Sequence, residues 1–188
     1  GEESVKPSDH EHVIPKDWRL IATMNTYDKT SLYEMSYAFM RRFAFIPVPA
    51  PKEETINQLL VEKYLDIWNI DDNRFAQPVA DLWGVINRFR KVGPATIEDI
   101  YKTLLKTTNG ALNTNLDYSS ALIMHVLPQF EGLLEEDITD FIKNLNKLSS
   151  DVKDFGEDDV QEISDFAAEY FQINREKLPT PAEEKKSE

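Results

Sequence analysis

Apolar residues recur at helical spacing through most of the chain after residue 51. Each set places an apolar side chain every three or four positions, which predicts amphipathic helices. The sets are Ile56, Leu59, Leu60, Tyr64 and Ile67; Val79, Leu82, Trp83, Ile86 and Phe89; Ile97, Ile100, Tyr101, Leu104 and Leu105; Ile138, Phe141, Ile142, Leu145 and Leu148; and Val160, Ile163, Ala167, Tyr170 and Phe171. Residues 121–127 form a shorter candidate. This part of the chain is predicted to be a helical bundle.

Two short apolar runs precede this region, at residues 18–24 and 43–48. Nearly continuous apolar runs of this length predict strands buried on both faces of a parallel sheet. Residues 32–42 between them predict about three helical turns, with Thr30 or Ser31 as the cap. Prolines at positions 47, 49 and 51 then end regular pairing, because proline donates no N–H and restricts the residue before it.

These patterns predict four segments. Residues 1–16 lack periodicity and are expected to be a loop or leader; residues 17–49 form a small α/β part; residues 50–176 form the helical part. Residues 177–188 are rich in Pro, Glu, Lys and Ser and are expected to be disordered. The predicted fold class is mainly α with a small α/β remnant.

Composition narrows the class of protein. The chain has 188 residues, of which 41% are hydrophobic, and this is enough to build a core. It contains neither an apolar run of the roughly 18 residues that a membrane span needs nor a signal-peptide pattern, so we expect a soluble, cytoplasmic protein. The absence of cysteine excludes disulfides, thiolate metal sites and a cysteine nucleophile.

Charge bears on the partners of the chain. The net charge of -13 opposes phosphate backbones, so direct nucleic-acid binding is not expected. Residues 134–169 contain twelve Asp or Glu but only three Lys. Such a bias is typical of a solvated surface, and the alternative is a surface that binds a partner.

Asn25 is the first candidate for chemistry. It follows the first predicted strand, at the carboxyl edge where open parallel sheets place their ligands. A neutral amide there can hold a terminal phosphate oxygen or orient an attacking water. The alternative is that Asn25 only organises a turn with Thr26 and Asp28.

Arg41 and Arg42 are the second candidate, between the predicted helix and the second strand. Guanidinium groups match phosphate oxygens in geometry and charge, so one of them could act as an arginine finger. The alternative is that the pair compensates the helix dipole and forms surface salt bridges.

Residues 20–29 read LIATMNTYDK and residues 36–46 read SYAFMRRFAFI. Over about residues 18–49 the chain resembles the AAA+ ATPases of the McrB and MoxR-like, dynein-related branch. The resemblance implies that Asn25 is sensor 1, that Arg42, or else Arg41, is the arginine finger, and that the two strands are the last of the AAA+ parallel sheet. The helical remainder resembles the AAA+ lid.

The chain departs from that family in two places. Ser36 stands where many relatives have Asp. Many relatives carry a sensor 2 Arg at the start of a lid helix. The corresponding residues 92–97 contain no Arg. Arg88, Arg90 and Lys91 either substitute for it or are solvent-facing residues at the end of a basic helix, so sensor 2 is unassigned.

The chain also lacks the parts that hold a nucleotide. No glycines have the spacing of a phosphate-binding P-loop, and no apolar strand ends in an acidic pair for magnesium. Both precede sensor 1 in the family, so the resemblance implies the C-terminal part of an ATPase module, completed by an upstream P-loop half and a homo-oligomeric ring. ATP with Mg is the expected cofactor of the full-length protein, GTP stays open, and the chain alone is expected to be inactive. The alternative is a noncatalytic helical protein-interaction module.

Other candidate residues have simpler explanations. His10 and His12 form a pair without a third metal ligand and are expected to be surface residues. His125 is expected to be a packing histidine, and Trp68, Trp83 and Phe89 are expected to be core residues because they lie at helical spacing.

Overall fold

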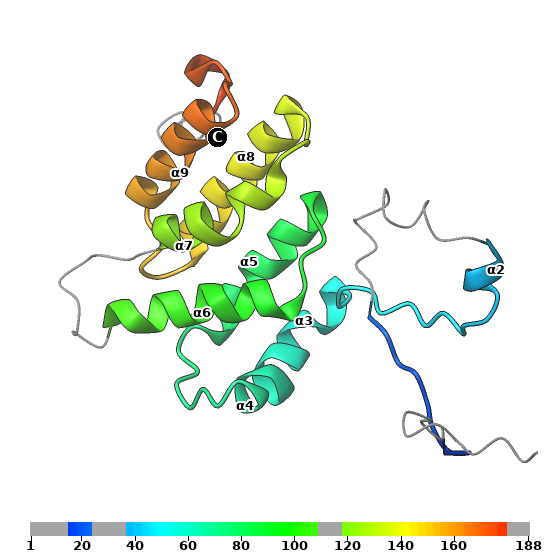
Figure 1. Cartoon of the computed structure of the whole chain (residues 1–188). Coiled ribbons are helices and arrows are strands. Elements are labelled where there is room, and N and C mark those ends of the chain that lie inside the picture. The colour runs from blue at the N-terminus through cyan, green and yellow to red at the C-terminus, as the bar shows by residue number, and fades with distance from the viewer. Residues whose placement is uncertain (1–14, 24–36, 109–117, 180–188) are drawn as a thin grey trace, which may run out of the picture. The chain divides into compact units, whose positions relative to one another are not determined.

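The computed structural model describes residues 15–23, 37–108 and 118–179 (Figure 1). By its internal contacts the chain divides into two units, Gly1–Pro47 and Val48–Glu188. We refer to them as the N-terminal unit and the helical unit.

The helical unit is a succession of helices. Its α-helices are α3 (Glu53–Leu59), α4 (Leu65–Ile67), α5 (Ala76–Phe89), α6 (Pro94–Thr108), α7 (Tyr118–His125), α8 (Glu135–Asp151) and α9 (Glu157–Tyr170). A π-helix, Leu60–Tyr64, joins α3 to α4, and short 3-10 helices occupy Leu127–Phe130 and Arg175–Lys177. Helix α5 packs against α3, α6 and α8, while α9 packs against α7 and α8 (Figure 1). The predicted helical bundle is confirmed.

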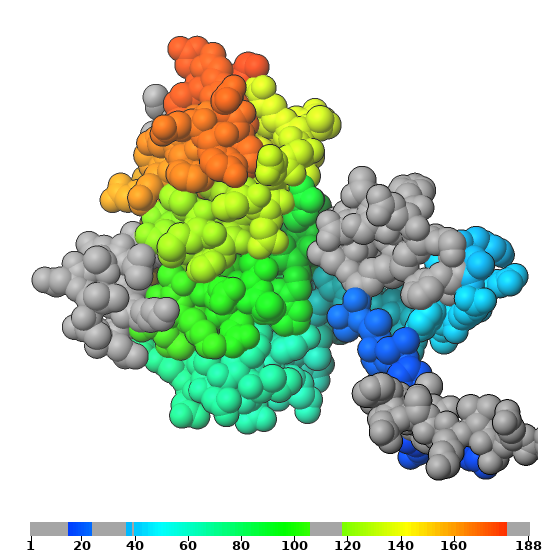
Figure 2. All heavy atoms as spheres, in the orientation of Figure 1, coloured from blue at the N-terminus to red at the C-terminus, as the bar shows by residue number. Residues whose placement is uncertain are grey.

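One core runs through these helices, and it is built from the apolar faces that the sequence predicts. Trp83 on α5 is fully buried, and its indole Nε1 donates a hydrogen bond to the Val92 carbonyl at 3.1 Å. Phe141 on α8 lies edge-on to Phe89 and Phe130, with ring centroids 5.6 and 4.7 Å apart. The space-filling view shows the side chains of the helical unit as a continuous mass (Figure 2).

The π-helix changes which residues of the first predicted helix of the bundle, residues 56–67, face the core. Ile56, Leu60 and Leu65 are buried, whereas Ile67 is 66% exposed. Hydrogen bonds from residue i to i+5 insert an extra residue into the turn, so the side chains that follow rotate away from ideal α-helical spacing. The prediction of an apolar face that includes Ile67 was therefore wrong.

The N-terminal unit contains α2 (Tyr37–Met40), the last turn of the helix predicted for residues 32–42. Residues 18–23 and 44–47, predicted as parts of strands, form no strand in the described part of the chain. Ile21 and Ile46 are 89% and 82% exposed rather than buried. A strand exists only by pairing with a neighbour, and Pro47 has no N–H to contribute, so apolar character alone does not make one.

The ordered chain extends past the end of α9. Leu178, inside the segment expected to be disordered, is only 2% exposed and joins the core after Arg175–Lys177. Residues 180–188 lie outside the described residues. Among the helices that are described, none combines the length and apolarity needed to cross a bilayer.

Candidate functional site

Asn25, the predicted sensor 1 residue, lies outside the residues that the structure describes, as do Thr26 and Asp28. Neither its predicted role at a phosphate nor the alternative role in a turn is tested by the geometry. Its assignment stays a prediction.

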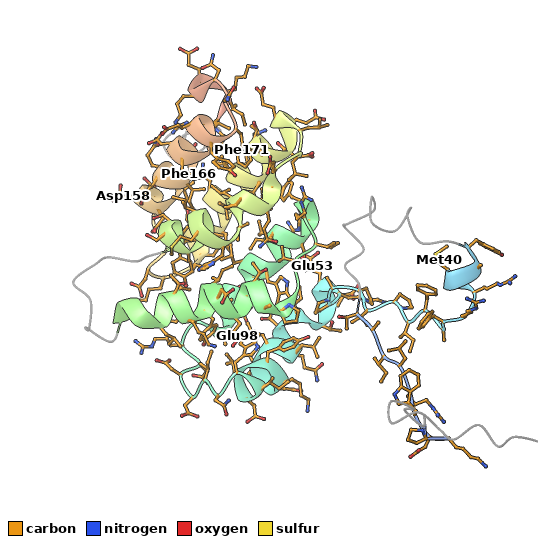
Figure 3. The ribbon with its side chains drawn as sticks, in the orientation of Figure 1. Met40, Glu53, Glu98, Asp158, Phe166 and Phe171 are labelled. Carbon is orange, nitrogen blue, oxygen red and sulfur yellow. The ribbon has the colours of Figure 1, made fainter. Side chains whose placement is uncertain are left out.

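Arg41 and Arg42 directly follow α2. The Arg41 N–H donates to the Tyr37 carbonyl at 3.2 Å and the Phe43 N–H to the Met40 carbonyl at 3.1 Å, so the helical turn closes at this pair. Both arginines are exposed, and neither forms an ion pair within the described ranges. Met40 marks this position in Figure 3. Two permanently charged, fork-shaped donor groups are thus available to an anion.

Two of the basic residues at the end of α5, unlike Arg41 and Arg42, bond other segments of the helical unit. The Arg88 guanidinium pairs with Glu53 on α3 at 2.7 Å and donates to the Asn144 side chain on α8 at 3.4 Å. Arg90 donates to the Glu131 carbonyl at 2.7 Å, and Lys91 is exposed. Arg88 and Arg90 therefore join neighbouring segments of the helical unit rather than only facing solvent.

The remaining predicted residues have structural roles or are not described. His125, at the end of α7, is half-buried, and its Nε2 lies 3.0 Å from the Thr103 hydroxyl on α6. Trp83 is buried, while Trp68 and Phe89 are partly buried against the core. His10 and His12 lie outside the described residues, and the described part of the chain holds no metal-binding cluster of His, Cys, Asp or Glu.

The structure brings together a polar group that the sequence analysis did not single out, where α7 begins beside the start of α9. We call it the α7–α9 junction, and it consists of Ser119, Gly156, Asp159 and Glu162. The Asp159 carboxylate accepts the Gly156 N–H at 2.8 Å and the Ser119 N–H at 3.1 Å. The Ser119 hydroxyl donates to Glu162 at 2.5 Å. Asp158, the exposed neighbour of Asp159, is labelled in Figure 3.

The spacing of Gly156 and Asp159 was the one signal in the sequence for this junction. An acidic residue three positions after the N-cap commonly accepts the N-cap N–H. The contact with Ser119 joins residues 40 positions apart, and no local pattern indicates it.

Two buried tyrosines have raised pKa values. Burial raises the pKa of Tyr101 to about 12, and its hydroxyl donates to the Asp72 carbonyl at 2.7 Å. Burial also raises the pKa of Tyr118, and the negative charges of Asp154 and Asp159 add to this shift. Both groups stay neutral hydroxyls at neutral pH, and neither lies near Arg41 or Arg42 in the sequence.

The geometry defines a mainly helical protein with an exposed arginine pair in its N-terminal unit. Comparisons with protein-family models, with curated proteins and with solved structures find no match.

Proposed function

We propose that the chain supplies the phosphate-sensing and lid parts of an AAA+ ATPase module that works in a ring. In this proposal Asn25 senses the terminal phosphate of its own subunit. Arg42, or else Arg41, reaches the nucleotide of the adjacent subunit, and the helical unit is the lid. Hydrolysis in the assembled ring is coupled to remodelling of a substrate.

The observation that carries the proposal is the state of the arginine pair. Both guanidinium groups are exposed at the end of a helical turn, and neither is used in an ion pair in the described residues. An arginine that serves only as a surface salt bridge is expected to have a carboxylate beside it, as Arg74 has Asp72 and Arg175 has Asp165. An arginine without such a partner leaves its guanidinium group available to a phosphoryl group on a neighbouring subunit, where an arginine finger acts.

The donor chemistry fits a phosphoryl group. Each guanidinium offers five N–H donors with permanent charge, and charge spreads over the phosphoryl oxygens during transfer. ATP is the expected nucleotide and GTP is the alternative. Mg²⁺ bound with the nucleotide would neutralise the developing charge in the complete module. The residues of this chain would position and stabilise that phosphoryl group, and the upstream half would hold it.

The test places Arg42→Ala in the protein together with its upstream P-loop half. Loss of an arginine finger lowers the rate of hydrolysis by about 10³-fold or more, while nucleotide affinity changes little. Arg19→Ala is the matched control, because Arg19 is another exposed arginine of the same unit and, among the described residues, donates to the Lys16 and Trp18 carbonyls. Wild-type hydrolysis by both Arg41→Ala and Arg42→Ala variants would contradict the finger assignment.

A mixing experiment separates action in trans from action within one subunit. Subunits with Arg42→Ala and subunits with Asn25→Ala, each inactive alone, should recover hydrolysis when mixed. Some interfaces then combine an intact Asn25 with an intact Arg42. No recovery in rings shown to be mixed would rule out a finger that acts across the interface.

A noncatalytic helical interaction module is the second candidate. The acidic first turns of α8 and α9, with three consecutive acidic residues each, favour it as a surface for a basic partner. An upstream reading frame without a P-loop would support this candidate and exclude the ATPase.

A further inference from the structure

Residues 46–52, Ile-Pro-Val-Pro-Ala-Pro-Lys, join the two units, since the boundary lies between Pro47 and Val48. Prolines at every second position make the backbone of this segment unusual. Each proline ring fixes its own φ near −65°. Each proline also disfavours the α region for the residue before it, so Ile46, Val48 and Ala50 are biased toward extended or polyproline II conformations.

The last residue of the segment, Lys52, precedes no proline and is the N-cap of α3, and its backbone is extended as is usual at that position. Lys52 has φ −74° and ψ 147°, which are polyproline II values. Within the described chain, residues 44–51 make no backbone hydrogen bond, as is usual for polyproline II, which has none internally. All seven residues from Ile46 to Lys52 are thus restricted or biased by covalent geometry, or observed in this conformation.

The C-terminal end of this segment, Lys52, is hydrogen-bonded to the first turn of α3 in the helical unit. The Lys52 carbonyl accepts both the N–H and the hydroxyl of Thr55 at 2.9 Å, which begins α3. Ile56 and Leu60 are buried in the core, and Glu53 pairs with Arg88 on α5. The polyproline segment therefore continues directly into a helix that is packed against its neighbours.

We propose that residues 46–52 form a semi-rigid polyproline II strut that leads into α3. Such a strut holds its own ends at a set separation and passes a displacement of residue 46 to α3 instead of absorbing it, as a Gly- or Ser-rich linker would. The proposal depends only on this segment and α3, and it stands whether or not the protein is an ATPase.

The absence of cysteine allows a direct test on the whole chain. Ala44→Cys and Lys52→Cys place two spin labels at exposed positions, one just before the strut and one at its last residue, and double electron–electron resonance measures the distance between them. Eight residue steps span about 25 Å in polyproline II but only about 16 Å, with a broad distribution, in a Gly-rich coil. We expect a narrow distribution near the longer value.

Replacement of Pro47, Pro49 and Pro51 together by Gly should shorten the mean distance by several ångströms and at least double the width of the distribution. Pro128→Ala, at an exposed proline of the helical unit, is the matched control and should change neither. Circular dichroism checks that each variant keeps its helical content. A wild-type distribution as broad as that of the Gly variant, or one centred near the shorter value, would overturn the proposal.

Discussion

At the scale of single residues, polar side chains on the helices of the helical unit bond backbone groups of the irregular segments beside them. The Tyr101 hydroxyl on α6 bonds the Asp72 carbonyl, and the Asn87 side chain at the end of α5 accepts the Val92 N–H at 2.8 Å. Each such bond satisfies a group that would otherwise be costly to bury. Irregular loops are thereby fixed to regular helices.

The raised pKa of Tyr101 predicts how stability depends on pH. Its pKa is about 12 in the folded protein, against about 10 in an unfolded chain. Above pH 10 the unfolded state releases its proton first. The stabilising contribution is therefore complete below about pH 10 and is lost as the pH rises through about 12. Tyr101→Phe should make the decline in unfolding free energy less steep in this range, as measured by urea titrations between about pH 8 and pH 11.

Two effects must be separated in that experiment. Tyr101→Phe also removes the bond to the Asp72 carbonyl, which lowers stability by about 0.5–1.5 kcal/mol at every pH. Tyr118 contributes to the wild-type slope as well, because its pKa is raised too. The informative quantity is the difference in slope, and parallel curves for wild type and variant would show that Tyr101 does not ionise differently on folding.

At the scale of elements, the α7–α9 junction uses one carboxylate at the start of two helices. Asp159 accepts an N–H from Gly156 at the start of α9 and another from Ser119 at the start of α7. The first N–H groups of a helix lack partners within it and carry partial positive charge, so a shared carboxylate stabilises both ends.

This arrangement predicts that Asp159→Ala destabilises the protein more than an ordinary first-turn substitution. The cost should be about 1–2 kcal/mol, since loss of a capping interaction costs about 0.5–2 kcal/mol. Asp158→Ala is the control, because it removes an exposed acidic residue from the same turn and should cost about 0.5 kcal/mol or less. Equal unfolding free energies of the two variants in urea would show that Asp159 does not bridge the helices.

The helices could be predicted from the sequence, whereas strand pairing could not. Helices α5, α6, α8 and α9 follow from their apolar spacing, because each helix makes its own hydrogen bonds and needs a neighbour only to cover one face. The strands predicted at residues 18–24 and 43–48 depend on partners that no local pattern reveals. The π-helix at Leu60–Tyr64 was not predicted either, and the contact of Asp159 with Ser119 joins residues 40 positions apart, beyond the reach of a local pattern. For the candidate site, the sequence predicted the helical turn before Arg41 and Arg42. That both side chains are exposed and form no ion pair among the described residues could be seen only in the structure.

At the scale of the whole molecule, the buried core belongs to the helical unit. Among the described residues, every buried hydrophobic side chain lies between Ile56 and Leu178. The large apolar side chains Trp18, Ile21 and Ile46 of the N-terminal unit are at least half exposed. The described residues therefore predict that the helical unit provides the stability of the chain.

A truncation tests this distribution. A chain of residues 48–188 should keep the helical circular-dichroism signal and unfold in one transition, with a free energy within about 0.5 kcal/mol of the value for the full chain. The full chain is the control, and urea titrations of both give the comparison. A loss of more than about 2 kcal/mol would mean that residues 1–47 contribute to the core.

The alternation of Ile46, Pro47, Val48 and Pro49 has a consequence for the chain in concentrated solution. Ile46 and Val48 are 82% and 90% exposed, and exposed β-branched residues in an extended segment favour pairing between molecules. Each is followed by a proline, which interrupts the row of N–H donors that an intermolecular sheet requires. The prolines therefore act as gatekeepers against aggregation, and their replacement by residues with an N–H would leave an exposed apolar stretch open to fibril formation.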